Sequence, residues 1–505
     1  MNGADIELPR LLIGEKIVKV KYFKEQTPIH SLSSLRAIEG LAKAKNYRQI
    51  GEFGPVMAAK SLKDHDRNSE FQRYSAIFGR DSLRVAIDLV SKYPKLAETT
   101  LIKLAELQGV KFDILSEEEP GRIIHEARDP KIDPIARQLT KQLNWKWPYY
   151  GSVDATPEFI RTLIAYCKFE KDYKIMTYEY VNRAGEKCNI ANALSSAVSW
   201  ILNRLSANKE GLLEFKRANP NGIENQAWKD SWDSYFHADG KIANHKQGIA
   251  SVEVQRVTVD ALLDAASYYE LGFDKSHRVQ ELKERANHLS QQIAKYFWID
   301  ELGGYFVLGT DRDHRGQLRQ LAVRTSNMGH LLHSQLLKGN DIDTTTRRHA
   351  VISQLFSPEL LSASGIRTLA SNELRFRPGA YHNGSVWTWD NYLILQGLEN
   401  HGYYGLANFL RKILLKDITV VHRLPEYFRG DLDNVLRLNT RLVEVYDDIN
   451  KRFNTLEQPP QDVQAWTAAA ILAIKLKRHL PVFALEVRKK NFEKKILSQV
   501  TFIES

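Results

Sequence analysis

The stretch NQAWKDSWDSYFHADG, residues 225–240, concentrates acids and aromatic rings in a short polar segment. Asp230, Asp233 and Asp239 alternate there with tryptophan, tyrosine, phenylalanine and histidine. Carboxylates bind hydroxyl groups, and broad aromatic rings offer apolar surface to the C–H faces of a pyranose. The run is too polar for a core helix and too aromatic for an ordinary solvent loop. These residue types therefore predict a site that binds a sugar.

Four more segments carry acids beside aromatic, histidine or glycine residues. They are IFGRDSLR (77–84), YYGSVDATPEF (149–159), YHNGSVWTWDN (381–391) and HRLPEYFRG (422–430). Asp81 and Asp154 each stand beside an expected helix start, where helix capping explains an acid equally well. Of the nine tryptophans, Trp200 and Trp298 fit ordinary amphipathic helix patterns, and the others fall in or beside polar loops. That gathering favours a functional centre.

Glu426 is the acid that is hardest to assign to a structural role. It follows Pro425, which favours an irregular or extended segment over a surface helix. Tyr427 and Phe428 would bury its carboxyl group and raise the pKa, whereas neighbouring arginines would lower it. Hydrolysis of a glycosidic bond needs two carboxyl groups on opposite faces of the sugar, one protonated and one that activates water or attacks carbon. Asp230 and Glu426, on different segments, are candidates for that pair, although the sequence leaves their mutual placement open.

Helices must position these segments. Apolar residues recur at spacings of three and four in several stretches, which predicts helices. These stretches span residues 83–90, 97–105, 156–167, 194–201 and 279–293. Residues 464–476 are apolar over most of their length, which is typical of an inner helix. Thr156 and Pro157 mark a helix start, with a hydroxyl cap followed by proline at the first helical position. Strand-like runs are few, at 212–216 and 303–309, so we expect an all-α fold with small β-hairpins in its loops.

Two helical architectures are open at this point. An α-solenoid would show a repeat of about 34 to 45 residues, and no such period is visible in the chain. A closed toroid of stacked helical hairpins therefore fits better. No linker or shift in composition divides the sequence, so we expect a single catalytic domain over residues 1–505.

The chain is basic, with a formal net charge of +10 and a pI of about 9.2. An excess of positive charge can serve nucleic-acid binding, but here lysine and arginine are spread along the whole sequence. The densest clusters, TTRRHA at 345–350 and VRKKNFEKK at 487–495, lie on expected helices with acids nearby. We therefore expect no nucleic-acid partner.

Targeting and cofactor signals are missing from the sequence. No apolar run reaches the ~20 residues that span a bilayer, and Asp5 and Glu7 make the N-terminal residues a poor signal peptide. Cys167 and Cys188 form neither a CxxC motif nor a disulfide framework. These features predict a cytoplasmic protein without a membrane partner. Since HExxH, paired CxxC, P-loop and Rossmann motifs are absent, we expect no metal and no organic cofactor.

Taken together, the segments resemble the bacterial glycogen-debranching, amylo-α-1,6-glucosidase-like proteins, six-hairpin glycosidases related to glucoamylases and trehalases. The matching motifs run in order from about residue 70 to 475: FGRDS, LAELQG, EEPGRIIHE, YYGSVDATP, NQAWKDSWDS, VEVQ, TSNMGHLL, SGIRTLA, YHNGSVWTWDN, RLPEYF and QAW. The resemblance implies an (α/α)6 toroid. It also implies an inverting, exo-acting α-glucosidase that releases glucose from an α-glucan or a small α-glucoside.

The resemblance further implies roles for single residues. Asp230 matches the general acid, and Glu426 matches the general base that activates water. Arg80 and Asp81 match the pair that holds the hydroxyls of the nonreducing terminal sugar. Further contacts to that sugar are implied for Asp154, Trp228, Lys229, His382, Trp387 and Asp390. Asp233 is the alternative to Asp230 as the acid, and otherwise a substrate contact.

Several features depart from the family pattern. We expect the β-rich domain that often precedes the toroid to be absent, because FGRDS already begins at residue 78. Ala227 stands where glycine is usual, SASGIRTL lacks the usual tryptophan, and Trp389 of WTWD replaces a histidine. These departures leave the catalytic pair intact, and they bring a smaller α-glucoside or another glycoside into consideration beside glycogen.

Two other functions on the same toroid stay open. A sugar epimerase would use histidines instead of an acid pair, and His125, His330 and His382 lie in the motif segments. A carbohydrate-binding protein without catalytic activity would keep the sugar contacts alone.

Overall fold

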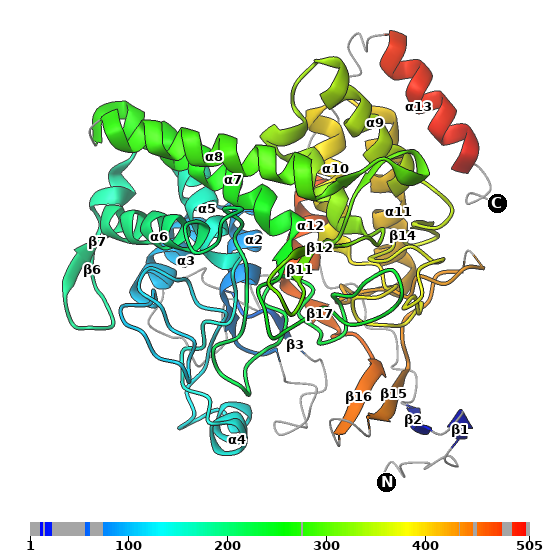
Figure 1. The fold of residues 1–505 in the computed structure, drawn as a ribbon, viewed down its shortest axis with the longest axis horizontal. Helices are drawn as coiled ribbons and strands as arrows, with labels where there is room; N and C mark the ends of the chain where they lie inside the picture. The colour runs from blue at the N-terminus through cyan, green and yellow to red at the C-terminus, as the bar shows by residue number, and fades with distance from the viewer. Residues whose placement is uncertain are drawn as a thin grey trace.

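The structure, a computed structural model, describes residues 11–13, 16–22, 56–60, 74–273, 276–433, 435–447, 452–476 and 487–500. Helices dominate the described chain. In Figure 1 they fill the upper part of the molecule, long loops gather below them, and a small sheet lies at the lower right.

An inner set of helical elements packs side by side. The set consists of α2 (Gly79–Leu89), α5 (Ala155–Glu170), α7 (Val252–Tyr268), η6 (Ser326–His333), α10 (Thr388–Asn400) and α12 (Ala465–Leu476). Each element contacts the next in chain order, and α12 contacts α2. The contacts therefore close a ring, which brings residues near position 80 beside residues near position 465.

An outer set of helices covers this ring. It consists of α3 (Pro94–Glu106), α6 (Ile190–Leu205), α8 (Ser276–Tyr296), α9 (Ile342–Leu355) and α11 (Tyr404–Val421). Each of these contacts an inner element that is close to it in sequence, as α8 contacts α7 and α11 contacts α10. Helix α13 (Val487–Val500) packs on α11, and α4 (Pro134–Leu143) extends from the loops at the bottom of Figure 1. Short helical turns are η3 (Lys174–Thr177), η4 (Tyr269–Phe273), η5 (Glu301–Gly303) and η7 (Gln335–Leu337).

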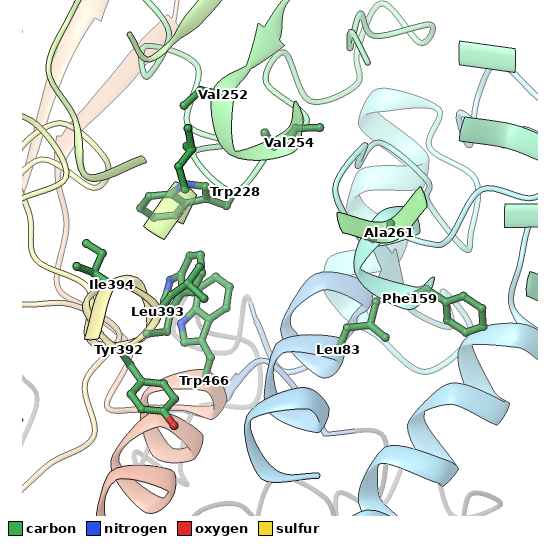
Figure 2. Close-up of a cluster of buried hydrophobic side chains, with 14 of the residues drawn as sticks. Leu83, Phe159, Trp228, Val252, Val254, Ala261, Tyr392, Leu393, Ile394 and Trp466 are labelled. Carbon is green, nitrogen blue, oxygen red and sulfur yellow. The ribbon is translucent and has the colours of Figure 1, made fainter. Parts of the chain in front are cut away.

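Helix α12 shows how the sequence produces an inner element. Its residues AWTAAAILAIKL are apolar around most of the helix, and all residues from Ala465 to Ile474 are buried. A helix that is apolar on every side is stable only when neighbours surround it. Figure 2 shows Trp466 of α12 and Leu393 of α10 near Trp228, with Leu83 of α2 across the interior.

The largest sheet pairs two N-terminal strands with two strands that precede α12. Antiparallel strands run in the order β1 (Leu11–Ile13), β2 (Lys16–Tyr22), β15 (Arg441–Asp447) and β16 (Arg452–Glu457). The remaining strands form small antiparallel pairs or triplets within the loops. They are β3 (Ala59–Lys60) with β17 (Val463–Gln464), β4 (Ile77–Phe78) with β5 (Glu126–Ala127), β6 (Glu179–Val181) with β7 (Lys187–Asn189), β9 (Trp298–Ile299) with β10 (Tyr305–Phe306), β13 (Leu361–Ser362) with β14 (Gly365–Ile366), and β8 (Ala250–Ser251) with β11 (Gly309–Arg312) and β12 (Leu318–Leu321).

The predicted helices are present, with two local differences from the sequence analysis. Helix α5 begins at Ala155, so Thr156 is not its cap; the Thr156 hydroxyl instead accepts a hydrogen bond of 3.0 Å from the backbone N–H of Ile123. The strand expected at 212–216 is reduced to one bridge between Phe215 and Ile249. The four-stranded sheet was not predicted. None of the helices in the described ranges is long and apolar enough to cross a membrane.

Candidate active site

A cavity at the loop end of the inner helices contains both acids of the expected pair. We call it the carboxylate pocket. Its described lining residues are Ala58, Tyr74, Phe78, Arg80, Asp81, Trp228, Asp230, Tyr381, His382, Trp387, Glu426, Gln464 and Trp466. The segments that carry them are far apart in the sequence, and the closed ring of helices brings them together. Asp230 and Glu426 thus face one common space.

Asp230 lies in an irregular loop, and its carboxylate contacts the side chain of Arg80. Arg80, at the start of α2, donates through Nε to Asp154 Oδ2 at 2.6 Å and through Nη1 to Asp230 Oδ2 at 3.4 Å. Asp154 is in turn fixed by the Ser152 hydroxyl, which donates to Oδ1 at 2.6 Å. Burial raises the pKa of Asp230 to about 6, although Arg80 opposes the rise.

Glu426 is more deeply buried, and neutral groups hold both of its carboxyl oxygens. Its Oε1 accepts a hydrogen bond from the Tyr381 hydroxyl, and its Oε2 accepts one of 3.2 Å from the backbone N–H of Gln461. Burial raises the pKa of Glu426 to about 7, and the hydrogen bond from Tyr381 partly offsets that rise. Burial therefore shifts the titration of both acids towards neutral pH.

Asp81 and Asp154 do not cap helices through their side chains. Phe78 occupies the N-cap of α2, and Asp154 occupies the N-cap of α5 without a side-chain capping bond. Asp81 instead accepts a hydrogen bond of 3.0 Å from Gln464 Nε2, and burial raises its pKa to about 7. The capping explanation is therefore wrong for both residues, because their carboxylates point to partners on other segments.

Aromatic rings form one wall of the carboxylate pocket. His382 stacks on Trp387 with ring centroids 5.3 Å apart, and Trp228 meets both rings edge to face. The backbone N–H of Ser231 and its hydroxyl both lie within hydrogen-bond distance of His382 Nδ1, at 3.3 and 2.8 Å. Since a backbone N–H can only donate, Nδ1 accepts and the proton of the neutral ring lies on Nε2. Burial lowers the pKa of His382 well below its ordinary value, so this ring offers one N–H donor.

Four of the expected substrate contacts, Asp154 among them, do not line the carboxylate pocket. Lys229 is fully buried and donates to the Thr368 carbonyl oxygen at 2.8 Å. Asp390 receives a hydrogen bond of 2.6 Å from His330 Nε2, and Asp233 receives one of 3.2 Å from Asn383 Nδ2. Asp233 lies in a turn and Asp230 in an irregular segment, so no helix relates the two acids. These groups support the pocket from behind.

Tyr381 and Gln464 are pocket residues that the sequence analysis did not single out. Each holds one acid: Tyr381 donates to Glu426, and Gln464 donates to Asp81. Both lie inside the motifs YHNGS and QAW, so the signal was present in the resemblance. Residue type alone gave no warning, because a tyrosine and a glutamine fit most environments.

The histidines considered for an epimerase do not gather in one place. His382 lines the carboxylate pocket, whereas His330 lines a different cavity and pairs with Asp390. His125 is buried and meets Phe78 edge to face. In the described part of the chain, no group of three or more histidine, cysteine, aspartate or glutamate side chains could hold a metal ion.

The family model of the mannosylglycerate hydrolase MGH1-like glycoside hydrolase domain matches residues 189–437. That segment contains both Asp230 and Glu426. The match identifies the chain as a glycoside hydrolase. No curated protein sequence matches the chain significantly.

Several solved structures are similar over most of the chain. One is a GH63 mannosylglycerate hydrolase from Thermus thermophilus in complex with Tris. The alignment covers 88% of this chain and 99% of that chain, with 14% identity and a TM-score of 0.43. Another is a bacterial glucoamylase complexed with acarbose. Its alignment covers 85% of this chain and 51% of the glucoamylase chain, with 13% identity and a TM-score of 0.46. Similarities of this size identify neither the substrate nor the catalytic residues of this chain.

Proposed function

We propose that this glycoside hydrolase is an inverting, exo-acting enzyme that removes one terminal hexose, with Asp230 as general acid and Glu426 as general base. The observation that carries the proposal is the shared pocket, because an acid and a base must reach the same glycosidic carbon from two sides. The raised pKa values of both groups support it, since one carboxyl must keep its proton near neutral pH while the other is ionised.

The substrate must redistribute the proton for these roles to hold. In the free pocket Arg80 stabilises the Asp230 carboxylate, which opposes the protonated form that a general acid needs. A sugar hydroxyl that accepts from Arg80 would weaken the 3.4 Å contact to Asp230. The pKa of Asp230 would then rise and that carboxyl would hold the proton for the leaving oxygen. Water bound to ionised Glu426 would attack from the opposite face in a single displacement.

An α-glucoside is the first substrate class to test, because the sequence motifs resemble α-glucosidases. The second class is a compact glycoside in which the sugar is joined to glycerate, because the matching family model bears the name of a mannosylglycerate hydrolase. We also infer that the ring of inner helices and its outer cover form the (α/α)6 toroid implied by the resemblance. The unbroken ring of contacts supports that inference.

The test is a panel of maltose, isomaltose, panose, trehalose, glucosylglycerate, mannosylglycerate and limit dextrin, followed by NMR from the first turnover. We expect one monosaccharide to be released, with its anomeric configuration inverted. Release of the retained anomer would contradict the role of Glu426 as a base that activates water. Conversion of one free sugar to another, without hydrolysis of any glycoside, would favour the epimerase.

A further inference from the structure

A second cavity lies next to the carboxylate pocket. We call it the inner chamber. Arg80, Trp228 and Trp466 line both spaces, so they form the common wall. Beyond them the chamber is lined by residues of the inner helices, among them Glu158 of α5, Val257 of α7 and Leu393 of α10. Figure 2 shows Trp228, Leu393 and Trp466 near one another at this boundary.

The chamber is small, and polar side chains stand among its largely apolar lining surface. Its volume is about 30 Å³, which suits one or two water molecules or a short side arm of a ligand. A space of this size receives a single small group.

Polar atoms of the chamber's lining residues lack hydrogen-bond partners among the described residues. They are Arg80 Nη2, Arg256 Nε and Nη1, Glu158 Oε2, and the indole N–H groups of Trp228, Trp389 and Trp466. Each of the three tryptophans and Arg256 is at most 5% exposed. Buried polar groups are nearly always paired in folded proteins. Several such groups around one small space indicate that a hydroxyl-bearing group or water completes them.

We propose that the inner chamber receives the exocyclic hydroxymethyl group of the terminal hexose. The proposal deepens the proposed function and rests on it. Reaction at the anomeric carbon requires that carbon to lie between Asp230 and Glu426. The hydroxymethyl arm on C5 extends two heavy atoms beyond the ring, whereas a ring hydroxyl extends only one. It is therefore the substituent that reaches past the wall of Arg80, Trp228 and Trp466, where its hydroxyl can accept from an N–H group and donate to Glu158.

This placement makes the enzyme specific for hexosides over pentosides. A pentoside lacks the arm and leaves the chamber's polar groups unpaired by substrate, while a 6-deoxyhexoside fills the space without its hydrogen bonds. We expect kcat/KM to fall at least about 100-fold from the hexoside to the matching pentoside, with the 6-deoxy sugar between them. The comparison uses the wild-type chain and aryl glycosides of glucose, 6-deoxyglucose and xylose, or the mannose, rhamnose and lyxose series if the panel favours mannose.

Two variants test the location of the discriminating space. Val257→Leu adds a methylene at the chamber, so the hexoside to pentoside ratio is expected to fall at least about tenfold. Val259→Leu is the matched control, because Val259 is equally buried on the same helix but does not line the chamber; its ratio should stay at the wild-type value. Thermal unfolding verifies that both variants are folded.

The outcomes separate this proposal from the proposed function. Hydrolysis of hexoside and pentoside with similar kcat/KM would overturn the chamber assignment and leave the hydrolase assignment standing. If no glycoside is hydrolysed, calorimetric titration with the free hexose and the free pentose tests the chamber assignment by itself. Tighter binding of the hexose, lost in Val257→Leu, would support the chamber alone, whereas equal binding or no binding would overturn it.

Discussion

The Tyr381 hydroxyl donates a hydrogen bond to Oε1 of Glu426, and this contact joins two motif segments at the candidate base. The bond stabilises the ionised form of Glu426 against the effect of burial. Tyr381 thereby lowers the pH at which Glu426 ionises. The same contact fixes the carboxyl group relative to the aromatic wall, because Tyr381 also meets the Trp387 ring edge to face.

Tyr381→Phe removes the donor and keeps the ring. We expect the pKa of Glu426 to rise, so that the limb of the pH profile governed by Glu426 moves to higher pH. If Glu426 is the base, the acidic limb moves, and kcat/KM at pH 6 falls roughly tenfold. A shift of the alkaline limb instead would show that Glu426 carries the proton and acts as the acid. A profile identical to that of the wild type would mean that the bond has no effect on catalysis.

The wild-type profile itself is predicted to be narrow. Activity should rise with pH as one carboxyl of the pair loses its proton near pH 6, and it should fall as the second loses its proton near pH 7. The two limits belong to the coupled pair, so neither is assigned to one residue from the profile alone. The measurement is kcat/KM from pH 4.5 to 9, with thermal unfolding at each pH as the control. Constant activity from pH 5 to 8 would contradict the raised pKa values.

Asp154→Asn tests the support of Arg80, which lines the pocket beside Asp230. The Asp154 carboxylate holds Arg80 through the 2.6 Å contact, and its negative charge raises the pKa of Asp230. The variant should lower the pKa of Asp230, move the limb governed by Asp230 to lower pH, and reduce kcat/KM about 10²-fold. Ser152→Ala is the milder comparison, because it removes only the hydroxyl that donates to Asp154. If Asp154→Asn leaves the profile in place, Asp154 serves packing alone.

Asp417 lies outside the carboxylate pocket, and its burial leads to a prediction about the stability of the fold. This residue of α11 is 1% exposed, and neither carboxyl oxygen has a hydrogen-bond partner among the described residues. Burial raises its pKa to about 8, so the native state favours the protonated form. Because the native state binds this proton more tightly than the unfolded state does, protonated Asp417 stabilises the fold fully below pH 4. That stabilisation is lost as the pH rises towards 8.

Asp417→Asn cannot ionise, so the variant should gain stability over the wild type at pH 8 relative to pH 5, by on the order of 1–3 kcal/mol. Chemical denaturation at the two pH values measures the difference. Asp343→Asn, an exposed position at the start of α9, is the control and should show no comparable gain. An equal pH dependence in Asp417→Asn and the wild type would show that Asp417 is not held protonated.

Much of the helical fold is predictable from the sequence because its signal is local. The three-and-four spacing of apolar residues is sufficient to locate α2, α3, α5, α6 and α8, and a run that is apolar over most of its length locates α12. The sheet of β1, β2, β15 and β16 was missed, even though KIVKVKY alternates polar and apolar residues as a strand does. Its pairing joins segments more than 400 positions apart in the chain, and no local pattern reveals such a partner.

The candidate site also has a part that the sequence predicts and a part that it does not. Acids in aromatic loops were visible as residue types, and the motif resemblance selected Asp230 and Glu426 from among them. Lys229, Asp233 and Asp390 carry the same chemistry, yet they point away from the pocket to Thr368, Asn383 and His330. The direction of a side chain in an irregular loop depends on contacts with distant segments, which the sequence does not display.

The most direct test of the central claim compares Asp230→Ala and Glu426→Ala on two substrates, an unactivated glycoside and the α-glycosyl fluoride of the same sugar. Fluoride leaves with little help from an acid, whereas water must still be activated by the base. We predict that both variants lose at least about 10³-fold on the unactivated glycoside. Asp230→Ala should recover most of its activity on the fluoride, and Glu426→Ala should not. Wild-type turnover of the unactivated glycoside by either folded variant would contradict a reaction carried by these two carboxyl groups.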